Sequence, residues 1–327
     1  MSRDILILCE RKESGIHPVA FELINKALEI AEKTGDQINC LVLSDTEPET
    51  EELCRRGSDC VYIMTDESFE SPSERLYSRN IAQFIRETQP SIVLTGATNF
   101  GRSLAPRVAA ELETGLTADC TDLKIDNEGR LLQIRPAFSD NILASIKTIK
   151  NPQMATVRYK EFDEAPVDVT RKIEKKIIPA YFSGDEDVRI LEVSPPDEID
   201  ITDAEVVIAA GRGLKQAEDF AMLEELAELT GGMVGVSRAL VDASMAPSSI
   251  QIGYSGNRVK PKVYIACGIS GAPQHIAGMK EADYIIAINT DASAPIFNIA
   301  DVGIVGDMYK VIPAMIDSIK EGLECQG

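Results

Sequence analysis

Short apolar runs alternate with longer amphipathic segments along the first hundred residues. The apolar runs, each long enough for one buried strand, cover residues 4–10, 38–45, 60–65 and 91–98. The amphipathic segments that follow them cover residues 18–34, 49–57, 74–88 and 101–113. Continuous apolar strands separated by helices are typical of a parallel sheet covered on both faces. The pattern therefore predicts a doubly wound α/β unit.

The pattern changes after about residue 117. Several short strand-like segments follow one another up to residue 158, with no room for helices between them. We expect them to form an antiparallel extension of the first sheet. Residues 160–204 are charged, contain paired prolines and show little periodicity, which is typical of a connecting segment.

Strand and helix patterns alternate again in the last third. Apolar runs cover 204–211, 232–237, 262–268, 284–289 and 302–307, and helical patterns cover 217–229, 273–279 and 309–323. This predicts an α/β protein of two doubly wound parallel-sheet units, the second of them Rossmann-like. The expected domains are residues 1–195, including the connecting segment, and residues 196–327.

Composition narrows the classes of function. The 327 residues carry a net charge of −20, which disfavours nucleic-acid binding and allows an anionic cofactor only where the local charge is reversed. The apolar runs are too short to span a membrane and no targeting segment is recognisable, so we expect a cytoplasmic protein. Seven Cys without a C-x-x-C pair and two His predict no zinc or iron–sulfur site.

The loops that follow the last strands carry most of the candidate chemistry. Gly211-Arg212-Gly213 comes directly after an apolar run, where glycine lets backbone amides approach a phosphate. Gln216 occupies the third glycine position of the dinucleotide fingerprint, so NAD binding has weak support and a plain turn with a solvated arginine fits equally well. Pro273 opens a second helix after a run of small residues.

Two residues near this second helix allow alternative interpretations. Ser270 lies in a G-x-S-x-A sequence that resembles a nucleophile elbow, but Ala272 replaces the final glycine and the nearby His275 is poorly placed for a triad. A serine hydrolase is therefore a minor alternative. A histidine here is commonly structural, yet it can also donate to a ligand that gains negative charge, as a flavin does on reduction.

Five segments of the last third resemble the FAD domain of the electron-transfer flavoprotein α subunit. They are GRGL (211–214), VGVSRALVDA (234–243), IGYSGNRVKPKVYIACGISGAPQHIAGM (252–279), IIAINTDASAPIF (285–297) and ADVGIVGDMYKVIPA (300–314). The first half is similar more loosely, through APRVAAEL, IRPAF and PQMATVR. The resemblance implies an electron-carrier subunit rather than a stand-alone enzyme. It also implies FAD in the second domain and a heterodimer in which the first domain packs with a β subunit that holds its own FAD or AMP.

The resemblance also implies roles for individual residues. It places Arg212 and Ser237 near the cofactor phosphates, Arg238 against the isoalloxazine ring, Ser255 as a donor near the redox edge and His275 at the pyrimidine side. The other implied cofactor-binding residues are Ile252, Gly253, Tyr254, Ser270, Gly271, Ala272, Pro273, Gln274, Asn289, Asp307 and Met308. The chain departs from the family at Tyr254 and Ser255, where the usual loop is G-Q-T-G, and at Pro273, where a branched apolar residue is usual.

Two segments of the first half look closer to one branch of the family. GLTADCT (115–121) and PQMATVR (152–158) are similar to members from anaerobes and nitrogen fixers. That likeness implies electron bifurcation: NADH is oxidised at the β-subunit flavin, and electrons pass to ferredoxin and to an acyl-CoA dehydrogenase-type flavoenzyme. The opposing hypotheses are a self-contained NAD-dependent dehydrogenase and an interaction module.

Overall fold

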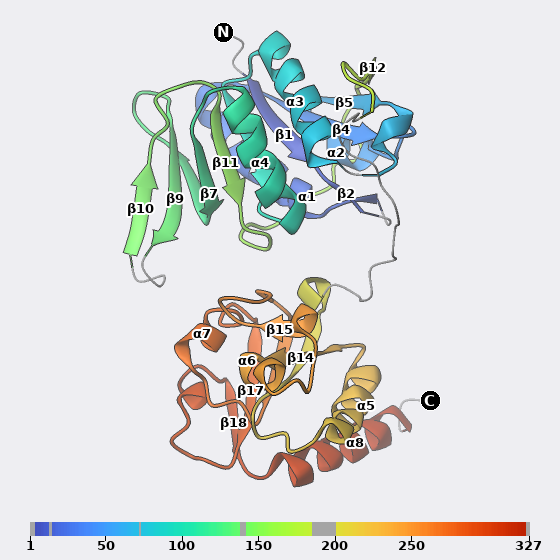
Figure 1. Cartoon of the computed structure of the whole chain (residues 1–327), viewed down its shortest axis with the longest axis vertical. Helices are drawn as coiled ribbons and strands as arrows, with labels where there is room; N and C mark the ends of the chain where they lie inside the picture. The colour runs from blue at the N-terminus through green and yellow to red at the C-terminus, as the bar shows by residue number, and fades with distance from the viewer. Residues whose placement is uncertain (1–3, 13–14, 72, 138–141, 185–200, 325–327) are drawn as a thin grey trace. The chain divides into compact units, whose positions relative to one another are not determined.

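The computed structural model describes residues 4–12, 15–71, 73–137, 142–184 and 201–324 (Figure 1). The chain divides into two compact units, Met1–Leu191 and Glu192–Gly327. The domain boundary predicted at residue 195 falls outside the described residues. Each unit has its own sheet and its own hydrophobic clusters, so the two are described separately.

A seven-stranded parallel sheet organises the first unit, in the order β12-β5-β4-β1-β6-β11-β7. The strands are β1 (Asp4–Cys9), β4 (Gln37–Ser44), β5 (Cys60–Thr65), β6 (Ile92–Gly96), β7 (Leu116–Cys120), β11 (Gln153–Val157) and β12 (Lys175–Pro179). A small antiparallel ribbon, β2 (Arg11–Lys12) with β3 (Gly15–Ile16), follows β1. Strands β1, β4, β5 and β6 fall within the four apolar runs expected from the sequence, except that β4 begins one residue earlier.

Helices cover both faces of this sheet (Figure 1). They are α1 (Val19–Thr34), α2 (Glu51–Arg56), α3 (Glu74–Thr88) and α4 (Asn99–Glu111), and a 3-10 turn, η1 (Glu67–Phe69), precedes α3. Ile5 and Ile7 belong to the cluster that includes α1, whereas Leu6 and Leu8 belong to the cluster that includes α3 and α4. Because neighbouring strand residues point to opposite faces, the continuous apolar run of β1 fills both cores.

The expected antiparallel extension is only partly right. Strands β7 and β11 join the main sheet in parallel, and only β8 (Asp122–Ile125), β9 (Leu131–Ala137) and β10 (Ile142–Ile146) are antiparallel, in a separate sheet. All five residues of β11 are buried, as an interior strand between two neighbours requires. The parallel pairing of β7 and β11 was not recognisable from the sequence. The chain between these two strands forms the β8–β10 sheet, where parallel strands are usually connected by a helix.

The interpretation of residues 160–204 as a connecting segment is wrong for β12. This strand pairs in parallel with β5 at the edge of the sheet. Lys175, Lys176 and Pro179 suit an edge, where one side of the backbone stays in solvent and charged side chains discourage further pairing. The same residues concealed the strand in the sequence, because they interrupt its apolar pattern.

The second unit is built on a six-stranded parallel sheet in the order β15-β14-β13-β16-β17-β18. The strands are β13 (Val206–Ala210), β14 (Met233–Ser237), β15 (Gln251–Ile252), β16 (Val263–Cys267), β17 (Tyr284–Asn289) and β18 (Val302–Val305). Strand order reverses between β13 and β16, and a crevice for ligands is expected at the carboxyl ends of the strands at such a point.

Helices and short turns cover the second sheet. They are α5 (Phe220–Thr230), α6 (Arg238–Asp242), α7 (Pro273–Ile276), α8 (Met308–Glu324), η2 (Ile201–Asp203), η3 (Ala217–Asp219), η4 (Ser248–Ile250) and η5 (Pro295–Asn298). Helices α5 and α8 pack side by side on one face (Figure 1). Loops and short turns occupy the other face, where α7 has four residues instead of the predicted seven.

Candidate cofactor-binding site

A cavity of about 820 Å³ opens at the carboxyl ends of the second sheet. Its volume lies within the range of small-molecule and cofactor sites. All predicted site residues except Gly271 and Pro273 line it: Arg212, Ser237, Arg238, Ile252, Gly253, Tyr254, Ser255, Ser270, Ala272, Gln274, His275, Asn289, Asp307 and Met308. The structure thus brings these residues together, and their contact with a cofactor stays a prediction.

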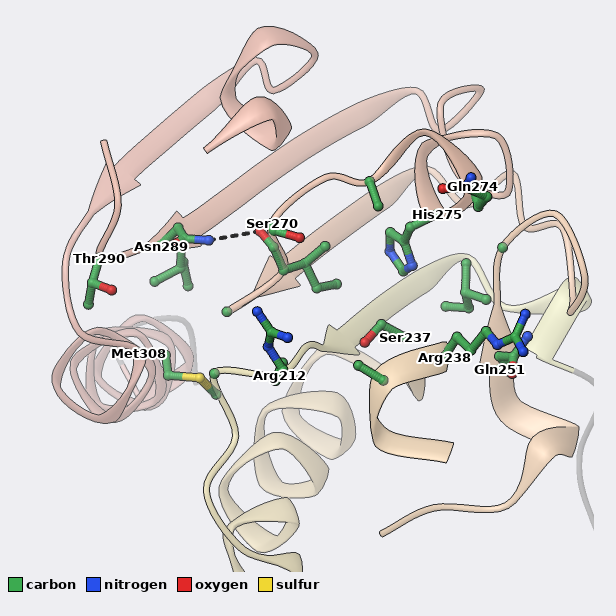
Figure 2. A pocket seen from close by; sticks show the side chains of 18 of the residues that line it. Arg212, Ser237, Arg238, Gln251, Ser270, Gln274, His275, Asn289, Thr290 and Met308 are labelled. Carbon is green, nitrogen blue, oxygen red and sulfur yellow. Dashed lines mark hydrogen bonds between the residues drawn. The ribbon is translucent and has the colours of Figure 1, made fainter. Parts of the chain in front are cut away.

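Two glycine loops meet in the wall of the cavity, at the reversal of strand order. The Gly211 N–H donates to the Cys267 carbonyl at 2.8 Å, and a Cβ at position 211 would lie 2.3 Å from the Gly268 carbonyl oxygen. Gly268 itself has a φ of +63°, and its Cβ would lie 2.8 Å from the Cα of Gly213. Only glycine allows this backbone contact, which leaves the side chain of Arg212 directed into the cavity (Figure 2).

Gly271 and Pro273 do not line the cavity but determine the shape of the loop that does. Gly271 has a φ of +86°, and a Cβ there would lie 2.3 Å from the backbone nitrogen of Ile296. Pro273 is the first residue of α7, where its fixed φ favours the turn. The two residues therefore shape the loop that presents Ser270 and His275 and do not line the cavity themselves.

Three cations line the cavity in a chain of strongly negative charge. Within the described part of the chain, Arg212 has no ion-pair partner, and Arg238 faces Asp242 at 3.4 Å in an exposed pair. Lys215 lies over the ring of Tyr309, with its nitrogen 4.7 Å from the ring centre. The local charge is therefore reversed at this edge of the sheet, as an anionic ligand requires.

The helix ends contribute little positive potential to the cavity. Helix α7 has only four residues, and residues 214–219 separate the Gly211 loop from α5. The long helix that begins at the cavity is α8, whose first turn is capped by Asp307: its carboxylate accepts from the Tyr309 N–H at 3.1 Å. The side-chain cations are therefore the main groups for holding an anion.

The turn that carries Ser255 is supported by two neighbours. The Tyr254 N–H donates to the Gln274 carbonyl at 2.7 Å, which anchors the turn to α7. The buried side-chain amide of Gln251 donates to the Ser255 hydroxyl at 3.3 Å, although Ser255 itself is exposed. Gln251 was not among the residues expected from the sequence, where its only signal is a polar residue placed directly before an apolar residue and a glycine turn.

His275 is buried in the cavity wall with one ring nitrogen bonded inside the protein. Its Nε2 lies 2.9 Å from the hydroxyl of Tyr264, and its Nδ1 is buried with no hydrogen-bond partner among the described residues. Burial lowers the pKa of His275 to about 4, and the nearby Ile252 carbonyl opposes this only weakly, so the ring is neutral at neutral pH. Because Nε2 is bonded to Tyr264 rather than Ser270, the geometry gives the serine-hydrolase alternative no support.

Four more lining residues were missed or only partly understood from the sequence. Lys215, Thr290 and Tyr309 belong to the lining, and Tyr309 accepts from the Lys215 N–H at 2.8 Å. Asn289 lines the cavity as predicted, and its side-chain amide donates to the Ile269 carbonyl at 2.9 Å (Figure 2). This bond ties the loops after β16 and β17 together. Such bonds join residues far apart in the chain and leave no local sequence signal.

A smaller cavity of about 150 Å³ lies at the corresponding edge of the first sheet. The hydroxyl of Thr98, at the N-terminus of α4, donates to the Glu10 carboxylate, which therefore occupies the place of an anion. Arg11 is bonded to Asp45 at 2.8 Å. The first unit thus already neutralises with its own side chains the groups that would hold a phosphate.

Fold and cavity together define a two-unit α/β protein whose second sheet carries a site suited to an anionic cofactor. The family model of the electron transfer flavoprotein domain matches residues 5–181, and that of the electron transfer flavoprotein FAD-binding domain matches residues 200–280. The chain belongs to the electron transfer flavoprotein family, as an α-type subunit, and its cofactor is FAD.

Relatives match along nearly the whole chain. The electron transfer flavoprotein subunit alpha of Thermoanaerobacterium thermosaccharolyticum is 42% identical, with 98% of both chains covered. Subunit LctC of the lactate dehydrogenase (NAD(+),ferredoxin) of Acetobacterium woodii is 43% identical over 97% of this chain and 77% of its own. Protein FixB of Azotobacter vinelandii is 38% identical over 98% and 92%. None of the described helices is long and apolar enough to cross a membrane.

Proposed function

We propose that this chain pairs with an electron transfer flavoprotein β subunit and passes electrons singly between a reduced donor and an acyl-CoA dehydrogenase-type flavoenzyme. The observation that carries the proposal is the cavity of the second unit, which combines the positive charge of Arg212 with a buried imidazole nitrogen, neither of them paired within the part of the chain that the structure describes. No pair of side chains poised for acid–base turnover of a substrate is needed for such a role. A carrier requires a site that binds its cofactor and tunes its potential.

The residues present fit FAD in chemistry as well as in volume. Arg212 and Lys215, beside the two glycine loops, provide charge and close backbone approach for a pyrophosphate. Away from Arg212, His275 provides an imidazole and Arg238 provides a planar cation (Figure 2). Ser255, which also lines the cavity, provides a hydroxyl. The first set would hold the phosphates and the second set would face the ring system.

Bound FAD supplies reversible uptake and release of one or two electrons. The protein contributes the groups that set how readily this occurs. A hydrogen bond from Ser255, held by Gln251, favours electron uptake at the ring atom to which it donates. His275, neutral and buried, can donate to an acceptor atom that becomes more negative, and Arg238 adds a positive field.

A bifurcating complex is the finer form of this proposal. The Acetobacterium woodii relative has NAD(+) and ferredoxin in its name, and a relative from Anaerotignum propionicum, 35% identical over 98% of this chain, is named as an electron transfer subunit of acryloyl-CoA reductase. These names support a nicotinamide cofactor and ferredoxin as electron-transfer partners. In the finer proposal NADH is the donor, through a second FAD in the β subunit, and ferredoxin is one acceptor. Reduction of ferredoxin by NADH in the reconstituted complex, dependent on an acyl-CoA partner, tests this form.

Reconstitution tests the proposal directly. We expect the chain, mixed with its β subunit and FAD, to retain flavin absorbance after gel filtration. Arg212→Gln should weaken FAD binding roughly ten- to hundredfold, since a charge-assisted hydrogen bond contributes about 1.5–3 kcal/mol. Lys280→Gln removes the same charge from an exposed position of the same unit that does not line the cavity, and should leave binding unchanged. Absence of flavin from the complex would exclude the proposed function.

The opposing hypothesis, a self-contained NAD-dependent dehydrogenase, makes a different prediction. It requires NADH to bind the isolated chain and to pass a hydride to a small substrate there. A titration of the isolated chain with NADH, followed by cofactor fluorescence, separates the two hypotheses. No binding excludes the dehydrogenase, and binding at micromolar NADH with the β subunit absent would favour it.

A further inference from the structure

A buried tyrosine stands behind the histidine of the cavity. Tyr264, on β16, has no exposed surface and belongs to the core cluster under α7. Its hydroxyl lies 2.9 Å from Nε2 of His275, which lines the cavity with its ring directed into it (Figure 2). A tyrosine at this position is less favourable for the free energy of folding than a phenylalanine of the same shape, unless its buried hydroxyl forms a hydrogen bond.

The number of protons on the two side chains determines whether Tyr264 or His275 donates in this hydrogen bond. The pKa of Tyr264 is raised well above its ordinary value by burial, and that of His275 is lowered to about 4, so the hydroxyl keeps its proton and the imidazole carries one. If His275 donated from Nε2, the Tyr264 proton would be buried with no acceptor among the described residues. If Tyr264 donates, its proton is bonded and only a lone pair of its oxygen is left over in the core. The unbonded proton is then the one on Nδ1 of His275, near the Ile252 carbonyl and on a residue that lines the cavity, which is the cheaper arrangement.

The second arrangement leaves the imidazole proton on Nδ1. That nitrogen is buried and has no partner among the described residues, and the Ile252 carbonyl, although near enough to favour the protonated ring, does not form a hydrogen bond of normal geometry with it. The cavity wall thus holds an N–H donor that the protein itself does not use. An unused buried donor is costly unless a ligand supplies the acceptor.

We propose that Tyr264 is a positioning residue, which fixes His275 as the Nδ1–H tautomer and so presents a neutral donor to an acceptor atom of the cofactor. The inference rests on the proposed function, because it takes FAD as the source of that acceptor. A neutral donor favours the electron-rich form of the cofactor less strongly than an imidazolium would, and it does so without a pH-dependent charge. Tyr264 thereby tunes the cofactor without touching it.

The tautomer can be measured before any cofactor binds. The chain has only two histidines, so ¹⁵N-histidine labelling gives two sets of ring signals, and His17 serves as an internal reference. We expect His275 of the full chain to show a protonated Nδ1 and an accepting Nε2, and Tyr264→Phe to convert it to a mixture of tautomers with no change at His17. A wild-type His275 with its proton on Nε2 would overturn the proposal, whether or not any variant folds.

The potential of the FAD-loaded complex gives the second readout. Tyr264→Phe should change the ratio of oxidised to reduced FAD at a fixed potential about tenfold toward the oxidised form, which is about 59 mV for one electron. The same substitution in a His275→Gln background should have no effect, and Tyr77→Phe, which removes a buried hydroxyl from the other unit, should have none either. Equal effects in both backgrounds would show a merely structural role. Failure of the wild-type complex to hold FAD would exclude the proposed function and would leave the tautomer measurement to decide on Tyr264.

Discussion

At the scale of single residues, the site depends on side chains whose ordinary behaviour is changed by burial. His275 is neutral at neutral pH because burial lowers its pKa to about 4, while Arg212 lines the same cavity with an exposed side chain. Cys120 and Cys267 show the same effect without a function: burial raises the pKa of each thiol to about 12, so neither forms a reactive thiolate at neutral pH. Burial thus leaves His275 as a neutral donor for a ligand, whereas it makes Cys120 and Cys267 unreactive residues of the core.

Buried His275 should make the cofactor-free chain sensitive to acid. Its pKa is about 4 in the folded chain and about 6.5 when unfolded, so the unfolded state binds the proton more readily. The contribution of neutral His275 to the free energy of unfolding is fully present above pH 6.5. It decreases by about 3 kcal/mol as the pH falls to 4. Urea unfolding at pH 7 and pH 4 measures it. We expect a drop about 3 kcal/mol smaller in His275→Gln, and equal drops would contradict the assignment.

At the scale of elements, the loops after β13 and β16 have to be considered as one structure. Each contains glycines that the other loop requires, because the backbones touch where side chains would usually separate them. The strand pairs that bring them together, Ala210 with Cys267 among them, are far apart in the sequence. The cavity wall is therefore a property of the sheet and not of either loop alone.

Gly211→Ala should damage this wall. Its Cβ would meet the Gly268 carbonyl at 2.3 Å, so the two loops must separate, and we expect a loss of about 1–3 kcal/mol in unfolding free energy together with weakened FAD binding. Gly322→Ala makes the same change in α8, where nothing lies within 4 Å, and should be neutral or stabilise by about 0.5–1 kcal/mol. Thermal unfolding and FAD titration compare them. Unchanged FAD affinity in Gly211→Ala would contradict this account of the wall.

The residues that directly follow the edge strand β12 are bonded to α3 through one buried amide. Asn80, on α3, accepts from the backbone N–H groups of Tyr181 and Phe182 at 2.8 and 3.0 Å, and donates to the Phe182 carbonyl at 3.0 Å. Asn80→Leu should lower the free energy of unfolding by about 2–4 kcal/mol, because it leaves several backbone groups without hydrogen-bond partners. Amide exchange should show faster exchange at Ile177 and Ile178, whereas Gln83→Leu on the same helix should not. Unchanged protection would show that β12 is held by its pairing with β5 alone.

At the scale of the whole molecule, each unit carries its own sheet and its own apolar clusters. The net charge of −20 is a property of the chain as a whole, whereas the unpaired cation of the cavity belongs to the second unit. In the proposed function, cofactor binding and packing with the β subunit would therefore use different units. This division suits a carrier that must bind FAD tightly and still meet more than one protein.

The two units should fold separately. We expect fragments 1–195 and 196–327 each to unfold cooperatively on heating, because the described strands of each sheet pair only within their own unit. The second fragment should still bind FAD, more weakly than the complex with the β subunit. Circular dichroism and FAD titration provide the measurements. A second fragment without cooperative unfolding would show that the predicted boundary removes part of its core.

The alternation of most strands and helices in the two main sheets was determined by the sequence alone, because apolar periodicity is local and each run can be recognised from its own residues. The glycine loops, with Arg212 between two of them, were recognisable for the same reason. Only the tertiary structure decided that β11 enters the main sheet, that β12 forms its edge, and that Gln251 and Tyr264 stand behind Ser255 and His275. These features depend on pairing and burial between residues far apart in the chain, and on which polar groups find a partner once water is excluded.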